Sequence, residues 1–174
     1  MAVLQTLFPE TADNVFPGPK FATWIFYVLT TVVIVRSLIH MLADDGGAQS
    51  IASVPLDELT ADGKAAVISI FALWGLSQLV TALLFLACCV RYRSLIPLMC
   101  LVFVVENLGR VLLGVSKPLP TEHSPPGAVG SIVFFLAACG VLVAALLHPR
   151  CAAAPQEKKG GVAVTVAPRQ DQAC

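Results

Sequence analysis

Charged residues are scarce in this chain. Asp, Glu, Lys and Arg make up 13% of its 174 residues, whereas hydrophobic residues make up 57% and the mean hydropathy is +0.82. Ordinary soluble domains carry about 25% charged residues. The scarcity of charge excludes such a domain and indicates an integral membrane protein.

Several signatures of chemistry are also missing. The sequence has no glycine-rich phosphate loop, nucleophile elbow, dinucleotide fingerprint, HExxH or CxxC motif, and each of these motifs carries a specific catalytic or metal-binding mechanism. No basic stretch precedes an apolar core in residues 1–19, so a cleaved secretory signal is not expected. The sequence predicts no cofactor and no nucleic-acid partner, and it favours a non-enzymatic protein over an enzyme.

Cysteines are present, but not where disulfides form. Cys88, Cys89, Cys100 and Cys139 fall inside long apolar runs, where cysteine acts as a small hydrophobic residue. None of the six lies in a connection predicted to face outward, so the chain has no disulfide framework. Cys151, just beyond the last apolar run, is a candidate for lipidation by S-palmitoylation.

Long apolar runs dominate the rest of the sequence. A spanning helix needs roughly 20 mainly apolar residues, and four windows meet that length: 21–41, 65–90, 95–115 and 128–147. We therefore predict an all-α fold, an integral membrane bundle of four transmembrane helices over residues 20–148. A short interfacial lead at 1–19 precedes the bundle, and a flexible basic tail at 149–174 follows it.

The basic residues are distributed unevenly between the connections. The second connection holds Arg91 and Arg93, whereas the first and third hold only Lys64 and Lys117. Further basic residues lie in the tail: Arg150, Lys158, Lys159 and Arg169. Because cytoplasmic segments carry the excess of Lys and Arg, both termini are predicted on the cytoplasmic side.

The connections and small residues suggest how the helices pack. The first connection, residues 43–64, is long enough to fold back over the outer face with one helical turn. The short turn after Val90 predicts that the second and third spans are antiparallel neighbours. Small residues, which let membrane helices approach closely, occur in the second and fourth spans: Gly75, Ala137, Gly140 and Ala144.

Three polar residues interrupt the third apolar run: Glu106, Asn107 and Arg110. At about 100° per residue they share one side of a helix. A rise of about 1.5 Å per residue, counted from Ser94, places Glu106 about 18 Å and Arg110 about 24 Å into the bilayer. Ionisable residues at such a depth are candidates for function.

Two residues of other spans lie at matching depth. Arg36, counted from Lys20, lies about 24 Å along the first span, and Gln78 lies near the middle of the second. We expect Arg36 and Arg110 to flank Glu106, with Gln78 hydrogen-bonded into the cluster and one positive charge in excess. Two interpretations stay open: a structural i,i+4 ion pair with Arg36 reaching the headgroups, or a binding or proton-handling site.

A weaker candidate is a metal site on the outer face. His40 and Asp44 are four residues apart, and His123 lies in the third connection. Imidazole and carboxylate groups suit several divalent ions, although only the first two residues have supporting spacing. The identity of any metal is unknown.

Four segments carry a resemblance to known proteins: Phe71–Leu79, Arg91–Met99, Glu106–Arg110 and Pro125–Gly130. Together they resemble a group of small, uncharacterised four-span membrane proteins, and the similarity covers residues 43–147. The resemblance implies a shared helical fold and supplies no activity, cofactor or catalytic residue.

Three functions are compatible with these features. The first is a non-enzymatic accessory or interaction subunit in the lipid bilayer, with a membrane-protein partner or a second copy of the chain. The second is a small transporter or channel-like protein that handles protons or a small anion at Arg36, Glu106 and Arg110. The third, a lipid-modifying membrane enzyme, depends on the weak grouping of His40, Asp44 and His123. The sequence does not distinguish which membrane contains the protein.

Overall fold

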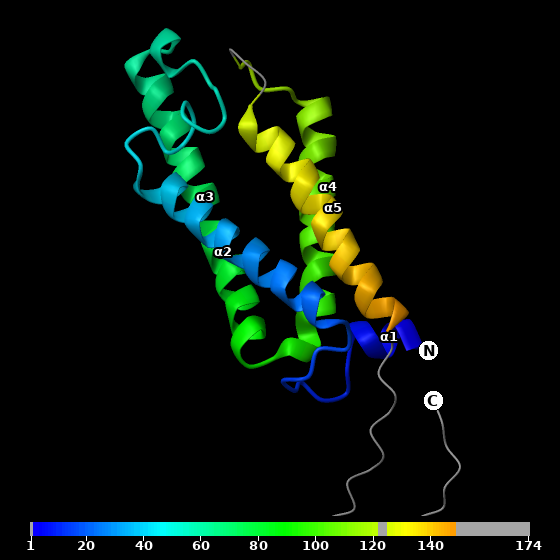
Figure 1. The fold of residues 1–174 in the computed structure, drawn as a ribbon. Coiled ribbons are helices and arrows are strands. Elements are labelled where there is room, and N and C mark those ends of the chain that lie inside the picture. Colours follow the sequence, from blue (N-terminus) through cyan, green and yellow to red (C-terminus); the bar gives the residue numbers. More distant parts are fainter. Residues whose placement is uncertain (1, 122–124, 149–174) are drawn as a thin grey trace, which may run out of the picture.

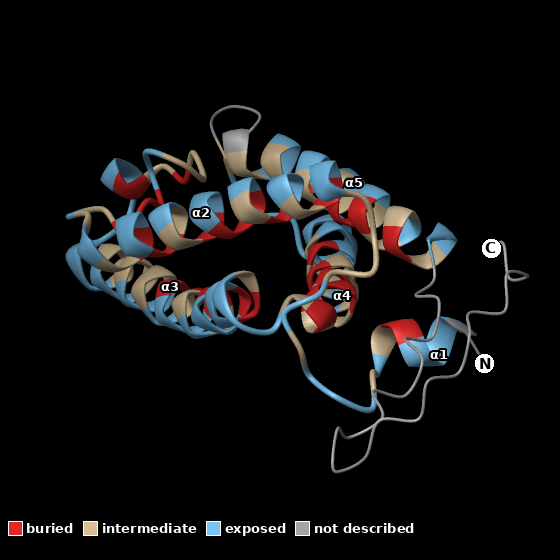
Figure 2. Ribbon diagram, turned by 60° about the horizontal axis from the view of Figure 1, so that its bottom comes forward, coloured by how far each residue is buried: buried red, intermediate tan, exposed pale blue. Residues whose placement is uncertain are grey.

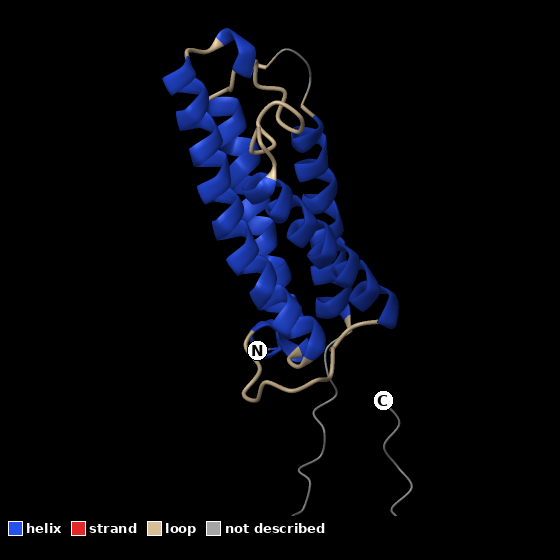
Figure 3. Cartoon of the chain, turned by 90° about the vertical axis from the view of Figure 1, so that its left-hand side faces the viewer, coloured by secondary structure: helices blue, strands red, loops and turns tan. Residues whose placement is uncertain are grey.

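The computed structural model describes residues 2–121 and 125–148, and this part of the chain is helical with no strand (Figure 3). Four of its helices are long and apolar enough to cross a membrane: α2 (Lys20–Leu42), α3 (Ala61–Val90), α4 (Ile96–Ser116) and α5 (Pro126–Leu147). They overlie the four predicted spans. The short helix α1 (Ala2–Leu7) lies in the lead, and two 3-10 turns, η1 (Leu56–Glu58) and η2 (Arg93–Leu95), lie in the connections.

Local chemistry fixes where the long helices begin. Pro19 precedes α2, Pro97 is in the first turn of α4, and Pro126 begins α5. Proline suits these positions because its fixed φ is helical and the first turn does not need its N–H. At α3 the Thr60 hydroxyl caps the helix by accepting a hydrogen bond from Gly63 N at 3.2 Å.

The four long helices form two antiparallel pairs (Figure 1). α2 packs along α3 and α4 packs along α5, while the pairs meet mainly through α2 and α5. α3 and α4 are joined by a short turn, yet they make few contacts with each other. The prediction that the short turn would make them packed neighbours therefore needs correction: it reverses the chain but does not hold the two helices together.

Small residues explain which helices pack closely. A Cβ atom at Gly75 would lie 2.7 Å from His40 Cβ and 3.0 Å from Ser37 O, so α3 approaches α2 where only glycine fits. In α5, Ala138 and Ala145 are fully buried. Gly140 belongs to the predicted small-residue stripe, but nothing lies within 4 Å of a Cβ placed there.

Aromatic residues fill the half of the bundle that is nearer the described termini. Phe26, Phe85 and Phe103 are each 1% exposed, and the buried positions line the inner faces of the helices (Figure 2). Ring centroids are 5.5 Å apart for Phe26 and Phe85, and 5.6 Å apart for Phe85 and Phe103. Phe134 of α5 continues the stack at 6.1 Å from Phe103.

The connection between α2 and α3 folds back over the other end of the bundle, as predicted. Ala48, Val54 and Leu56 form a small buried core against the start of α3. Gly46 and Gly47 adopt φ values of 60° and 70°, which glycine reaches without steric cost. This connection closes the end of the α2–α3 pair that lies away from the described termini.

Asp45 organises the turn in this connection. Its carboxylate accepts hydrogen bonds from Gly47 N at 2.8 Å and from Ser50 N at 2.7 Å. Burial opposes the charged form, but these hydrogen bonds outweigh it and hold the pKa of Asp45 below its ordinary value. The ionised carboxylate is thus part of the loop structure.

Candidate functional site

A chain of polar contacts links three helices in the middle of the bundle. Arg36 Nη2 of α2 donates to Gln78 Oε1 of α3 at 2.7 Å. Gln78 Nε2 donates in turn to Glu106 Oε1 of α4, and Arg110 Nη2 donates to the same carboxylate oxygen. We call Arg36, Gln78, Glu106 and Arg110 the polar bridge. It connects the two helix pairs across the space between α3 and α4.

The polar bridge contains the predicted residues, but Arg36 has a different partner from the one expected. Arg110 forms an ion pair with Glu106 four residues earlier, whereas the amide of Gln78 separates Arg36 from the carboxylate. Arg36 is therefore hydrogen-bonded to a neutral amide oxygen and not to a charged carboxylate. Its Nε is also buried without a hydrogen-bond partner, and an unpaired buried donor costs about 1–3 kcal/mol.

The Glu106–Arg110 pair is only partly buried. The Glu106 side chain is 25% exposed and the Arg110 side chain 17% exposed, so the expectation of a buried salt bridge is not supported. The reason is the divergence of α3 and α4, which leaves one side of the pair uncovered by this chain. The other ion pair found in residues 2–121 and 125–148 joins Lys64 and Asp57 at 3.4 Å, and both side chains are exposed.

Trp74 lies next to both guanidinium groups. The Arg110 Cζ atom is 4.7 Å from the centroid of the Trp74 ring, and the Arg36 Cζ atom is 5.7 Å from it. Cations at such distances are attracted by the electron-rich ring face. Trp74 is a residue of the site that the sequence analysis did not single out, although its position four residues before Gln78 places both on one helix face.

Asn107 does not join the polar bridge. It is fully buried, and its Nδ2 donates to the backbone oxygen of Phe103 at 2.8 Å. Its Oδ1 has no hydrogen-bond partner. Asn107 therefore faces the aromatic core, on the side of α4 next to Glu106.

His40 is held in a structural position. It is 1% exposed, its Nδ1 lies 2.8 Å from Gly46 O, and its ring centroid is 4.7 Å from that of Trp74. Asp44, its proposed metal-binding companion, is exposed. The part of the chain that the structure describes contains no group of three His, Cys, Asp or Glu residues that could hold a metal. The candidates His123 and Cys151 lie outside that part.

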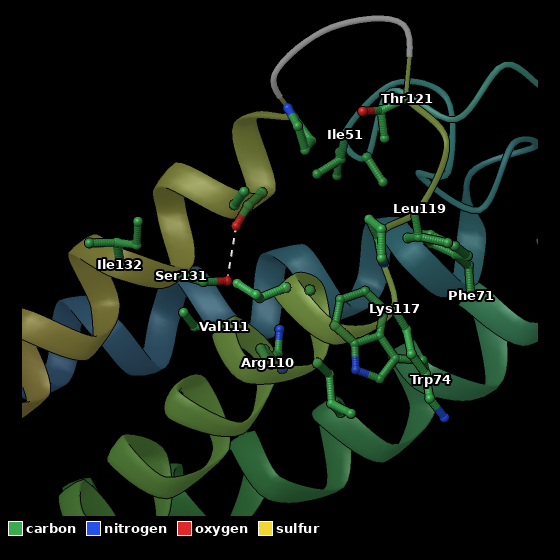
Figure 4. Close-up of a pocket in the computed structure, with 18 of the residues that line it drawn as sticks. Ile51, Phe71, Trp74, Arg110, Val111, Lys117, Leu119, Thr121, Ser131 and Ile132 are labelled. Carbon is green, nitrogen blue, oxygen red and sulfur yellow. Dashed lines mark hydrogen bonds between the residues drawn. The ribbon is translucent and has the colours of Figure 1, made fainter.

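A cavity of about 790 Å³ begins at the polar bridge and extends to the loops at the end of the bundle away from the described termini. Trp74 and Arg110 line it on one side, and Ser131 and Ile132 of α5 line it on another (Figure 4). Arg36 also lines the cavity. Most of the remaining lining is apolar and comes from α4, α5 and the connections between α2 and α3 and between α4 and α5. Ligand sites in proteins have this character, with volumes of about 300–1,000 Å³, apolar walls and a few polar groups.

The fold is an all-helical arrangement of four membrane-length helices with a polar centre. In comparisons with protein-family models, curated proteins and solved structures, no match to this chain was found. The resemblance to small four-span proteins therefore supplies no relative whose activity could be transferred. Function has to be argued from the site.

Proposed function

We propose that this protein is a non-enzymatic multi-pass membrane protein that binds an anion in the cavity beside the polar bridge and serves as an accessory or interaction subunit. One observation carries the proposal: the guanidinium groups of Arg36 and Arg110 both line the cavity, while Glu106 neutralises only one of them. In a partly buried site, an uncompensated cation attracts an anion more strongly than it would in bulk water.

Arg36 is the centre of this proposed site. Its hydrogen-bond partner in the polar bridge is the neutral amide of Gln78, and its Nε has an unused N–H. Arginine binds oxyanions through several N–H groups at once. A bound oxyanion would supply the counter-charge that the neutral Gln78 amide does not.

The side of the membrane follows from charge. The described ends of the chain and the turn containing Arg91 and Arg93 lie at one end of the bundle (Figure 1). Because basic segments stay in the cytoplasm, we assign this end to the cytoplasmic side and the cavity to the opposite side. The proposal does not depend on which cellular membrane holds the protein.

The packed half of the bundle favours binding over transport. Phe26, Phe85 and Phe103 are fully buried between the polar bridge and the end assigned to the cytoplasm, and the ring centroids of neighbouring pairs lie 5.5–5.6 Å apart. An ion crossing the protein would have to displace these packed rings. A small transporter or channel-like protein that handles protons or a small anion is therefore the second candidate. A lipid-modifying enzyme is not favoured by the described residues, because His40 is buried whereas Asp44 is exposed.

The test is anion binding monitored at Trp74. The chain has two tryptophans, so a Trp24→Phe protein reports on Trp74 alone, which lies against both guanidinium groups. Titrating acetate and inorganic phosphate should change its emission saturably, and Arg36→Gln should weaken the response at least tenfold. The matched control is Arg93→Gln, because Arg93 also lies over an aromatic ring, 5.8 Å from Tyr27, but at the opposite end of the bundle. Equal responses from Arg36→Gln and Arg93→Gln proteins would contradict anion binding here.

Two further measurements separate the modes of action. Proteoliposome flux should be the same for the native protein and for Glu106→Gln, and a substrate- or pH-dependent flux lost in the variant would support transport. Crosslinking after gentle detergent extraction should return a stoichiometric membrane partner, whereas a clean monomer would contradict the role of accessory subunit.

A further inference from the structure

The size and lining of the cavity identify the class of anion, provided that the proposed anion-binding function holds. A small anion beside Arg36 would occupy only the polar end of a cavity of about 790 Å³. The other walls include Val111, Val115, Leu119 and Ile132. Apolar walls of this extent favour an apolar partner, because burying apolar surface is favourable in proportion to area.

The charge of the polar bridge limits the charge of the ligand. Arg36 and Arg110 contribute two positive charges and Glu106 one negative charge, which leaves one positive charge in excess. Lys117, which also lines the cavity, is exposed at the end of α4 and can remain hydrated. The polar end therefore matches a headgroup with a single negative charge, as in a carboxylate.

The surroundings of the cavity favour arrival through the bilayer. The connection between α2 and α3 contributes Ile51 and Ala52 to the cavity wall. It carries four acidic residues, Asp44, Asp45, Asp57 and Glu58, and Asp62 follows in the first turn of α3. Like charges repel an anion approaching from water. An anion already dissolved in the membrane through its own apolar chain avoids this barrier.

We propose that the cavity binds a long-chain fatty carboxylate, with its headgroup on Arg36 and Arg110 beside Trp74 and its chain along the apolar walls of α4 and α5. The headgroup accepts hydrogen bonds from guanidinium N–H groups of Arg36 and Arg110, the two arginines that line the cavity. The acyl chain fills the space that the diverging helix pairs leave open. The ligand binds without chemical change.

The two tryptophans allow a sharp test in phosphatidylcholine nanodiscs. Bromine quenches tryptophan only at short range, so 9,10-dibromostearate is the probe. In a Trp24→Phe protein, quenching of Trp74 should saturate. Trp24 is 68% exposed and lies near the start of α2, at the opposite end of the bundle from the cavity. In a Trp74→Phe protein, quenching of Trp24 should rise only in proportion to the bromine in the membrane. Identical curves for the two proteins would overturn the proposal.

Two glycines of α4 provide a matched pair of positions where an added Cβ meets no neighbouring atom. A Cβ atom would meet nothing within 4 Å at either Gly109 or Gly114, but only Gly114 lines the cavity. Gly114→Leu should weaken the saturable quenching of Trp74 at least tenfold, whereas Gly109→Leu should leave it unchanged. Arg36→Gln should weaken it by a similar factor. Unchanged binding in Gly114→Leu would contradict the placement of the chain.

Additional ligands distinguish failure of this inference from failure of the proposed function. Dibromostearyl alcohol, which lacks the charge, should give no saturable component, and acetate should displace dibromostearate only at far higher concentration than myristate does. If acetate competes as well as myristate, anion binding stands and the fatty chain is wrong. If the alcohol binds as tightly as the acid, or if neither dibromostearate nor acetate affects Trp74, both proposals fail.

Discussion

The two ends of the bundle are built differently from the same four helices. Towards the described termini, Phe26, Phe85 and Phe103 fill the interior and bring the helix pairs together. At the opposite end, near the α2–α3 and α4–α5 connections, the helix pairs diverge. There the polar bridge joins them beside a cavity. The difference shows that apolar packing supplies stability at one end, whereas the other end keeps space and charge that stability alone does not need.

The largest effect is expected in the packed half. Phe85→Ala should lower the free energy of unfolding by about 3–5 kcal/mol, because it leaves a cavity in a closely packed aromatic stack. Leu84→Ala is the control, since Leu84 is 59% exposed. Steric-trapping or denaturant titrations in detergent provide the measurement, and equal losses in the two variants would show that the stack is not the stabilising element.

Gly75 tests the contact between α2 and α3. Gly75→Ala should destabilise the protein by about 1–3 kcal/mol through overpacking, because the added Cβ would lie 2.7 Å from His40 Cβ. Gly109→Ala should be neutral or slightly stabilising, since nothing lies within 4 Å of its Cβ. The same unfolding titrations compare the two substitutions, and a neutral Gly75→Ala would mean that the helices are farther apart.

The polar bridge should contribute less than the packed core. A double-mutant cycle of Gln78→Leu and Glu106→Gln should give a coupling energy of about 1 kcal/mol, in the range measured for hydrogen bonds between membrane helices. Ser77→Ala combined with Glu106→Gln is the control, because Ser77 is exposed and its hydroxyl donates to Leu73 O within α3. A coupling energy near zero for Gln78 and Glu106 would show that their hydrogen bond does not hold the two helix pairs together.

The smallest expected effect is the loosening of the connection between α2 and α3 at low pH. Because the pKa of Asp45 is lowered in the folded protein, the contribution of its ionised carboxylate to the stability of this connection is complete above about pH 4, the range of an unfolded aspartate. The contribution is lost as pH falls through the lower folded-state value. Limited proteolysis of residues 46–54 between pH 6 and pH 3 should therefore show acid-induced opening that Asp45→Asn makes insensitive to pH. The same acid response in both proteins would assign the opening to another group.

The sequence predicted the elements of this fold better than their arrangement. Apolar runs near residues 21–41 and 128–147 end at prolines or polar residues, so their helices follow from length alone. The spacing of Glu106 and Arg110 indicated their ion pair, and counting along the first span placed Arg36 at a matching depth. These inferences need only helical geometry.

The features that the sequence did not predict depend on how the helices pack against one another. Whether α3 and α4 pack closely is decided by contacts such as Gly75 against His40 and Ser37, which involve residues far apart in sequence. The divergence that follows separates Arg36 from Glu106, brings Gln78 between them and opens the cavity. The spacing of Trp74 and Gln78 shows that they share a face of α3. The contacts of Trp74 with Arg36 and Arg110 depend on how α2 and α4 pack against α3, which the sequence does not give.

The most direct measurement is solid-state NMR of the Glu106 carboxylate in a lipid bilayer. Carbon–nitrogen correlations from Glu106 Cδ should reach the side-chain nitrogens of both Gln78 and Arg110, because both donate to this carboxylate. A Glu106 carboxylate that correlates with neither would mean that no polar bridge joins the two helix pairs, and the cavity beside it would lose its charged end.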